Sequence, residues 1–311
     1  MDIKKYINDN SSQASKDKIK KIYYTKKLLA FMLIVSFVIW YILVGSFAEP
    51  PFISHIIGVI ILFCIFGYIF LLGEFTSIVN NIVIEAYLLK HPNTKYLVAS
   101  PIEETYYAKS NILPDYIDIS TYNYFNIPYN NLNIEVSGIR IKSEYKNSKS
   151  VETKSTTSYT GMFGKVDLPN NYNNALIIRK KTGIMDEIVS STLNKESINI
   201  FNIIKKIRDN DNDLDEFEKE YEVLSQNVNI NNLNIDIENA ILDFNNITGY
   251  KIELSIIDNV LFFKIPMFSF FNVSFNSKNI DDKEIENNII LLDQLCFLAQ
   301  KIIDSLQEIK F

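Results

Sequence analysis

Two long apolar runs dominate the pattern of hydrophobic and polar positions along the chain. Leu28 to Ala48 and Phe52 to Leu72 each hold 21 residues, and neither contains a charged side chain. At ~1.5 Å per residue such a helix extends about 31 Å, which matches the ~30 Å hydrocarbon core of a bilayer. Glu49-Pro50-Pro51 between them predicts a tight turn. Residues 28–72 are therefore predicted to form a transmembrane helical hairpin.

The pattern changes after the hairpin. In Gly73–Lys90 apolar residues recur at spacings of three and four, which predicts that the second helix continues as an amphipathic helix. Ser100-Pro101 and the acidic pair that follows are typical of another helix start. We therefore expect 73–114 to be a juxtamembrane helical region, followed by an α+β domain over 115–311.

Alternating apolar residues predict strands in that domain. Leu132–Val136 alternate, and Ile139 and Ile141 continue on the opposite parity, which predicts a β-bulge at Ser137-Gly138. Lys149–Thr160 is interpreted as either a returning edge strand or a loop. The remaining predicted strands are Ala175–Arg179, Lys251–Ile256 and Val260–Ile265, with a hairpin turn at Asp258-Asn259, and the aromatic run Phe268–Phe275 is predicted to be buried sheet.

Helical periodicity returns at Met185–Leu193, at Ile198–Ile207 and most clearly at the C-terminal end. There, apolar residues from Ile285 to Leu306 repeat at spacings of four and three after a capping-box-like start at Asp281. The stripe fits either a coiled-coil seam or a helix packed on its own sheet, and its width favours the second interpretation. The order of elements predicts an α+β fold with a mainly antiparallel sheet and a long C-terminal helix.

Charge is distributed unevenly around the hairpin. Residues 1–27 carry eight lysines and three aspartates, whereas the residues after Leu72 carry 23 basic and 33 acidic side chains. An acidic domain argues against a nucleic-acid partner, which needs a positive face. The positive-inside rule places the basic tail, and with it the domain after the hairpin, in the cytoplasm of an inner-membrane protein. Six lysines near the first run are predicted to contact lipid headgroups: Lys16, Lys18, Lys20, Lys21, Lys26 and Lys27.

Few residues point to catalysis. Histidine occurs only at positions 55 and 91, no zinc or phosphate-loop pattern is present, and no catalytic, cofactor-binding or metal-binding residue is assigned. In Asp209–Glu220, acidic residues occupy positions 1, 3, 5, 7 and 12 of a calcium loop, but Leu214 stands where that loop needs glycine. An acidic solvated turn is the ordinary interpretation.

Two short motifs carry a family resemblance. One runs from Gly161 to Tyr172 (GMFGKVDLPNNY), and the other from Asp215 to Val223 (DEFEKEYEV), with Asn227 where an acid is usual. On these residues the chain resembles a bacterial family called domain of unknown function thirty-one thirty-seven. The resemblance implies two N-terminal spans, an intracellular domain and no assigned catalytic residues. The motif residues are Gly161, Phe163, Asp167, Asp215, Phe217, Glu218, Tyr221 and Val223.

The leading hypothesis is a membrane-tethered cytoplasmic binding or scaffold module without catalytic activity and without a cofactor. Its expected partners are the lipid bilayer and a protein of unknown identity, and homo-oligomerisation stays open. Two alternatives remain. One is an enzyme that uses Asp167, Asp215 and Glu218 as general acids or bases. The other is a small channel or transporter subunit built on the hairpin.

Overall fold

The computed structural model describes residues 10–46, 52–146, 153–169, 172, 175–181, 202–204, 216–225, 235–267, 270–271 and 282–308. The chain divides into two compact units. Met1–Lys90 and Phe271–Ile289 form the first, which we call the helical unit, and His91–Phe270 with Ile290–Phe311 form the second, the sheet unit.

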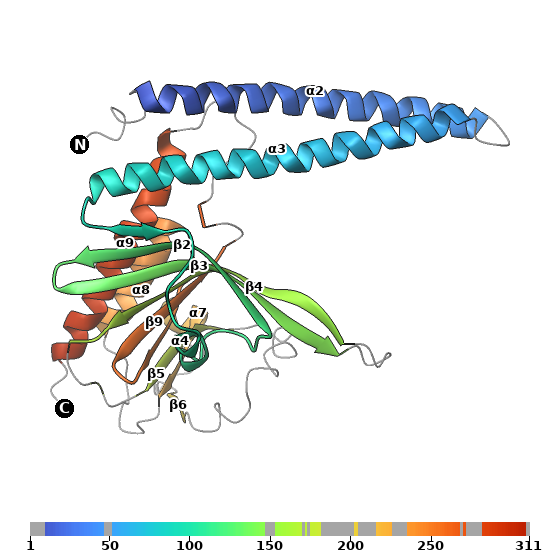
Figure 1. Ribbon diagram of the computed structural model, residues 1–311. Coiled ribbons are helices and arrows are strands. Elements are labelled where there is room, and N and C mark those ends of the chain that lie inside the picture. Colours follow the sequence, from blue (N-terminus) through green and yellow to red (C-terminus); the bar gives the residue numbers. More distant parts are fainter. Residues whose placement is uncertain are drawn as a thin grey trace. The chain divides into compact units, whose positions relative to one another are not determined.

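Two long helices make up most of the helical unit. They are α2 (Asn10–Ser46) and α3 (Phe52–Lys90), which run antiparallel to each other (Figure 1). Gly67 marks a close approach between them, because a Cβ placed there would lie 3.2 Å from Leu29 Cδ1. Both helices contain segments long and apolar enough to cross a membrane, Ser15–Val44 and His55–Lys90. Residues 28–46 of the first predicted run lie on α2, and the rest of that run is outside the described residues. The second run, 52–72, lies on α3, and the continuation of this helix to Lys90 is confirmed.

An antiparallel sheet is the centre of the sheet unit. Within the described residues it has nine strands in the order β1-β2-β3-β4-β9-β8-β5-β7-β6, and every neighbouring pair is antiparallel. The α+β class with an antiparallel sheet and a long C-terminal helix is confirmed. The strands are β1 (Lys95–Leu97), β2 (Asp118–Tyr129), β3 (Leu132–Lys146), β4 (Thr153–Asp167), β5 (Leu176–Lys180), β6 (Asn202–Ile204), β7 (Tyr221–Ser225), β8 (Glu253–Ile257) and β9 (Val260–Pro266). The other helices are α4 (Glu104–Lys109), α7 (Glu216–Glu220), α8 (Ile235–Thr248) and α9 (Asp282–Glu308).

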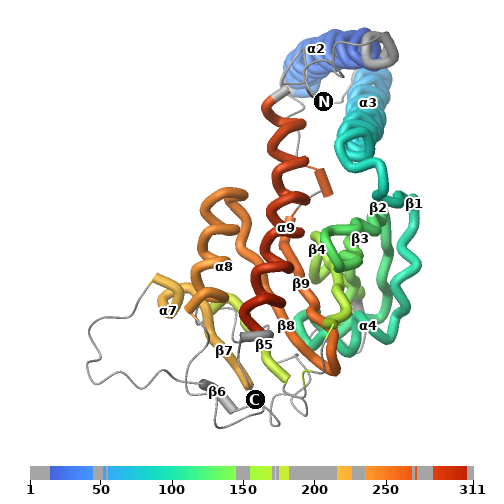
Figure 2. Tube along the Cα trace, turned by 90° about the vertical axis from the view of Figure 1, so that its left-hand side faces the viewer, coloured from blue at the N-terminus to red at the C-terminus, as the bar shows by residue number. Residues whose placement is uncertain are grey.

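Both faces of the sheet are covered (Figure 2). On one, which we call the helix face, Leu254 and Leu261 line a small apolar space together with Ile237 of α8 and Ile302 of α9. On the other, residues 98–117 with α4 cover an apolar cluster that includes Phe163. We call residues 98–117 the strap and this surface the strap face. The C-terminal part of α9 thus packs on its own sheet, as the width of its apolar stripe predicts.

Local sequence explains two of the chain reversals. Asp258 and Asn259 both have positive φ, 46° and 63°, which is the geometry of the two-residue turn that joins β8 to β9. Gly249 has φ 74° and donates its backbone N–H to the Asn245 carbonyl, which ends α8.

The predicted bulge lies on the neighbouring strand instead. β3 is continuous through Ser137 and Gly138, and the register shift falls in β2 between Tyr122 and Phe125. The change of parity in β3 has another cause: Ile134 and Ile139 point to opposite faces, and both are fully buried because each face has its own cover. A strand buried on both sides loses the simple alternation on which the prediction rested.

Other elements differ from the sequence prediction as well. Asn202–Ile204, expected to be helical, pairs with β7 as a strand. β1 lies inside the expected juxtamembrane helical region and pairs with β2, and the division between the units falls at Lys90 rather than at residue 115. Phe270 and Phe271 are buried as expected but follow β9 as a bend, not as sheet. The predicted helix Met185–Leu193 lies outside the described residues.

Candidate functional site

The strap brings polar groups onto the sheet. From β1 it reaches as far as β8, where Ser255 Oγ donates a hydrogen bond to the Ser110 carbonyl. It then returns to β3, where the Ile117 backbone N–H donates to the Lys142 carbonyl at 2.9 Å. The strap therefore crosses five strands, and the side chains beneath it are shielded from water.

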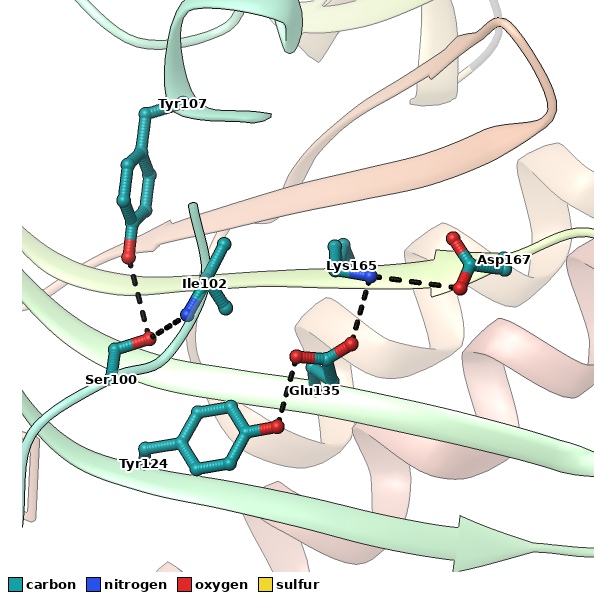
Figure 3. A network of polar contacts seen from close by, with 7 residues as sticks. All are labelled: Ser100, Ile102, Tyr107, Tyr124, Glu135, Lys165 and Asp167. Atoms are coloured by element: carbon teal, nitrogen blue, oxygen red, sulfur yellow. Dashed lines mark hydrogen bonds and ion pairs between the residues drawn. The ribbon is translucent and has the colours of Figure 1, made fainter. Parts of the chain in front are cut away.

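Lys165 of β4 lies at the centre of the polar groups under the strap (Figure 3). Its Nζ is 2.8 Å from Glu135 Oε1 and 3.6 Å from Asp167 Oδ2, and it sits 4.5 Å from the ring centroid of Tyr106 in the strap. The Lys165 side chain is only 8% exposed, whereas that of Asp167 is 72% exposed. A buried ammonium needs such partners, and Glu135 is the main one.

Tyrosine and serine hydroxyls complete the network (Figure 3). Tyr124 Oη donates to Glu135 Oε2 at 2.9 Å. Tyr107 Oη donates to Ser100 Oγ at 3.4 Å, and Ser100 Oγ also accepts the Ile102 backbone N–H at 3.1 Å. In this way Glu135 receives both a charged and a neutral donor.

Burial and charge hold the protons of this network in place. Burial lowers the pKa of Lys165, but the hydrogen bond and charge of Glu135, with Asp167, more than offset this and leave the pKa raised. Burial and the bond to Glu135 raise the pKa of Tyr124, and burial raises that of Tyr107. Lys165 is thus held as an ammonium ion and the tyrosines as phenols. A nucleophile needs the deprotonated form of such a group, and these side chains keep their protons.

Two further ion pairs lie on the strap face. Lys264 Nζ of β9 is 2.9 Å from Glu253 Oε2 of β8, and Arg179 of β5 pairs with Glu222 of β7. In each case, as for Glu135 and Lys165, the two residues are direct cross-strand partners. Opposite charges placed directly across strands favour one register over its alternatives. The charges of the strap face therefore have a structural role that their positions explain.

The residues of the first motif lie on β4. Phe163 is fully buried, 4.9 Å from Tyr107 between ring centroids. Gly161 cannot be replaced without movement, since a Cβ there would lie 2.2 Å from the Ile265 carbonyl oxygen. Asp167 ends the strand beside Lys165. The motif is a tightly packed strand, and its glycines permit close approach of neighbouring groups.

The described part of the second motif spans α7 and β7. The rings of Phe217 and Tyr221 stack at 5.0 Å between centroids and are both buried. Tyr221 Oη accepts a hydrogen bond from Asn245 Nδ2 at 2.9 Å, and burial raises the pKa of Tyr221 to about 12. Val223 pairs with Ile178 in the sheet. These contacts join α7 to β7, and they connect β7 to both α8 and β5.

The carboxylates of the enzyme hypothesis are spread over different elements. Asp167 is on β4 and Glu218 is on α7, directly before β7. β9, β8 and β5 separate those two strands, so at ~4.8 Å per spacing they lie about 19 Å apart. Asp215 and most of the calcium-like segment Asp209–Glu220 lie outside the described residues, and its described part, Glu216–Glu220, is helix α7. Elsewhere in the described chain no group of three metal-ligating side chains is found.

The predicted headgroup lysines fall into two groups in the helical unit. Lys18 Nζ is 2.9 Å from Glu74 Oε1 of α3, and Lys26 Nζ lies 5.7 Å from the Tyr68 ring centroid. The others contact their own helix or solvent: Lys27 lies 4.8 Å from the Tyr23 ring centroid, Lys20 is 3.9 Å from Asp17, and Lys21 is exposed. Lys16 is half-buried.

The buried pairs Glu135–Lys165 and Glu253–Lys264 are not among the residues that the sequence predicts for a site. The sequence does indicate that these two lysines are buried, because Lys165 and Lys264 each interrupt an apolar strand, in GMFGKVD and VLFFKIP. The partner of each lysine depends on register, which is not visible in a single strand.

Comparisons with known proteins do not identify a family for this chain. No family model matches the chain, and no curated protein matches it. The chain is similar to one solved structure, "crystal structure of the mycobacterial trehalose monomycolate transport factor A, TtfA", at 9% sequence identity and a TM-score of 0.35, over 70% of this chain and 92% of that chain. A likeness at this level carries no argument about fold or function. The resemblance to the family of unknown function stays a prediction.

Proposed function

We propose that this protein is a membrane-anchored binding module without catalytic activity. The α2–α3 hairpin anchors it in the inner membrane, and the sheet unit lies in the cytoplasm, where it binds a protein partner. The hairpin and the strap face support different parts of this proposal.

The main support for a membrane anchor is the exposure of apolar side chains in the helical unit. These side chains are exposed along one part of α2 and α3 and buried along the other. Between Leu28 and Leu72 most of them point outward, and Phe31, Phe63 and Phe70 are 65%, 74% and 72% exposed. Beyond this stretch most apolar side chains are buried, among them Ile19, Ile22, Phe75, Val79, Ile82 and Val83. Outward apolar residues are costly in water and favourable in lipid. The change of direction therefore supports a bilayer boundary near Lys27 on α2 and Gly73 on α3.

The lysines support the orientation. They precede the outward apolar stretch of α2, and no basic residue occurs between the two helices. Basic residues beside a span are retained on the cytoplasmic side. Since the chain crosses twice, the sheet unit returns to the same side as the lysines.

The described charges of the strap face fit a structural role better than a catalytic one. Its charges are arranged as direct cross-strand pairs, and its tyrosines hold their protons through burial. Three strands separate β4, which carries Asp167, from β7, which follows Glu218, whereas two carboxylates that share a reacting group lie about 5–10 Å apart.

Topology can be tested by cysteine labelling. In a Cys64→Ala, Cys296→Ala background, Ser158→Cys reports on the exposed part of β4 and Glu49→Cys on the link between the helices. A membrane-impermeant maleimide should label Glu49→Cys in intact spheroplasts and Ser158→Cys only after lysis. Labelling of Ser158→Cys in intact spheroplasts would contradict the proposed orientation. Recovery of the chain in the alkaline-wash supernatant would contradict the anchor.

Partner binding needs a separate test. The tagged full-length chain is cross-linked in cells, purified in mild detergent and compared with a chain that carries the α2–α3 hairpin alone. The proposal expects a protein that copurifies only when the sheet unit is present. Recovery of the same proteins with both baits would contradict a binding role for the sheet unit.

A further inference from the structure

We draw no further inference here: the strongest candidate, the exposed apolar side chains of Leu97 and Val98 at the end of the edge strand β1, carries none, because nothing in the described part of the structure shows what covers them.

Discussion

The helical unit and the sheet unit place apolar and charged side chains in opposite ways. In the outward stretch of the hairpin, apolar residues such as Phe63 cover the surface. In the sheet unit both faces are buried, and charged residues such as Lys165 and Glu135 lie inside as pairs. Under the proposed membrane anchor the two parts of the chain face different solvents. Exposed apolar groups are stable in lipid, whereas a charge that is shielded from water needs a partner.

The largest expected effect compares a glycine from each unit. Gly161→Ala brings a Cβ to 2.2 Å from the Ile265 carbonyl oxygen, so the β4–β9 pair must separate. We expect the sheet unit to lose about 3 kcal/mol or more of unfolding free energy, at or above the upper end for overpacking. At Gly73 of α3 nothing lies within 4 Å, and Gly73→Ala should instead stabilise the helix by about 0.5–1 kcal/mol. Denaturant unfolding in detergent measures both, and equal effects would contradict the packing at Gly161.

The next prediction applies one substitution to two exposed valines. Val38 in α2 is 54% exposed and Val98 in the strap is 76% exposed. If Val38 faces lipid near the centre of a span, Val38→Asp should cost about 2.5 kcal/mol in membrane insertion and reduce the membrane-bound fraction. Val98→Asp should change stability and membrane recovery by no more than about 0.5 kcal/mol. If both variants stay fully in the membrane fraction, the contrast between the two solvents is lost.

These contrasts also show which parts of the molecule a single sequence can predict. The two long helices of the hairpin are predictable because each depends on a run of consecutive apolar residues and needs no partner elsewhere in the sequence. Helix α8 was not predicted, although Ile237, Ile241 and Phe244 recur at spacings of four and three and are all buried. Its Asn and Asp residues have weak helix propensity, and packing against the sheet outweighs that propensity.

The polar network was the least predictable part, for a different reason. Lys165 and Glu135 are 30 positions apart in the sequence, and they meet only because β3 and β4 pair in one particular register. Lys264 and Glu253 meet in the same way. A charged residue inside an apolar strand indicates that a partner exists, but the identity of that partner depends on the hairpin register.

Removal of one charge from this network tests whether the sheet unit contains a true buried pair. Lys165→Met leaves Glu135 without its cation, and we expect a loss of about 2 kcal/mol. This is less than the ~3–5 kcal/mol for a fully buried pair, because Glu135 keeps 18% exposure. The double variant Lys165→Met/Glu135→Gln should recover most of the loss, since the introduced amide oxygen can still accept the hydrogen bond from Tyr124. A double variant no more stable than the single one would show that the pair is not the source of the effect.

Alkaline pH should weaken the sheet unit through its buried tyrosines and Lys165. Their folded-state pKa values are raised, so the folded chain keeps protons that the unfolded chain releases above pH 10. Stability is therefore full below pH 10 and falls as the pH rises further. For Tyr221, with a pKa of about 12, the loss at pH 11 is about 1 kcal/mol. Tyr221→Phe should show a shallower decline between pH 9 and pH 11 than the wild type, and an unchanged slope would contradict this assignment.

The smallest expected effect concerns the ion pair of the helical unit. Lys18 and Glu74 lie 2.9 Å apart, closely similar to Lys165 and Glu135, but their side chains are 56% and 31% exposed. Water screens both charges, so Lys18→Gln should change stability by no more than about 0.5 kcal/mol, even though it removes the same kind of charge as Lys165→Met. The effect should shrink further in 0.5 M salt, whereas that of Lys165→Met should persist. If Lys18→Gln proved as destabilising as Lys165→Met, the distance between the charges rather than their burial would determine stability, and the physical difference between the two units would not hold.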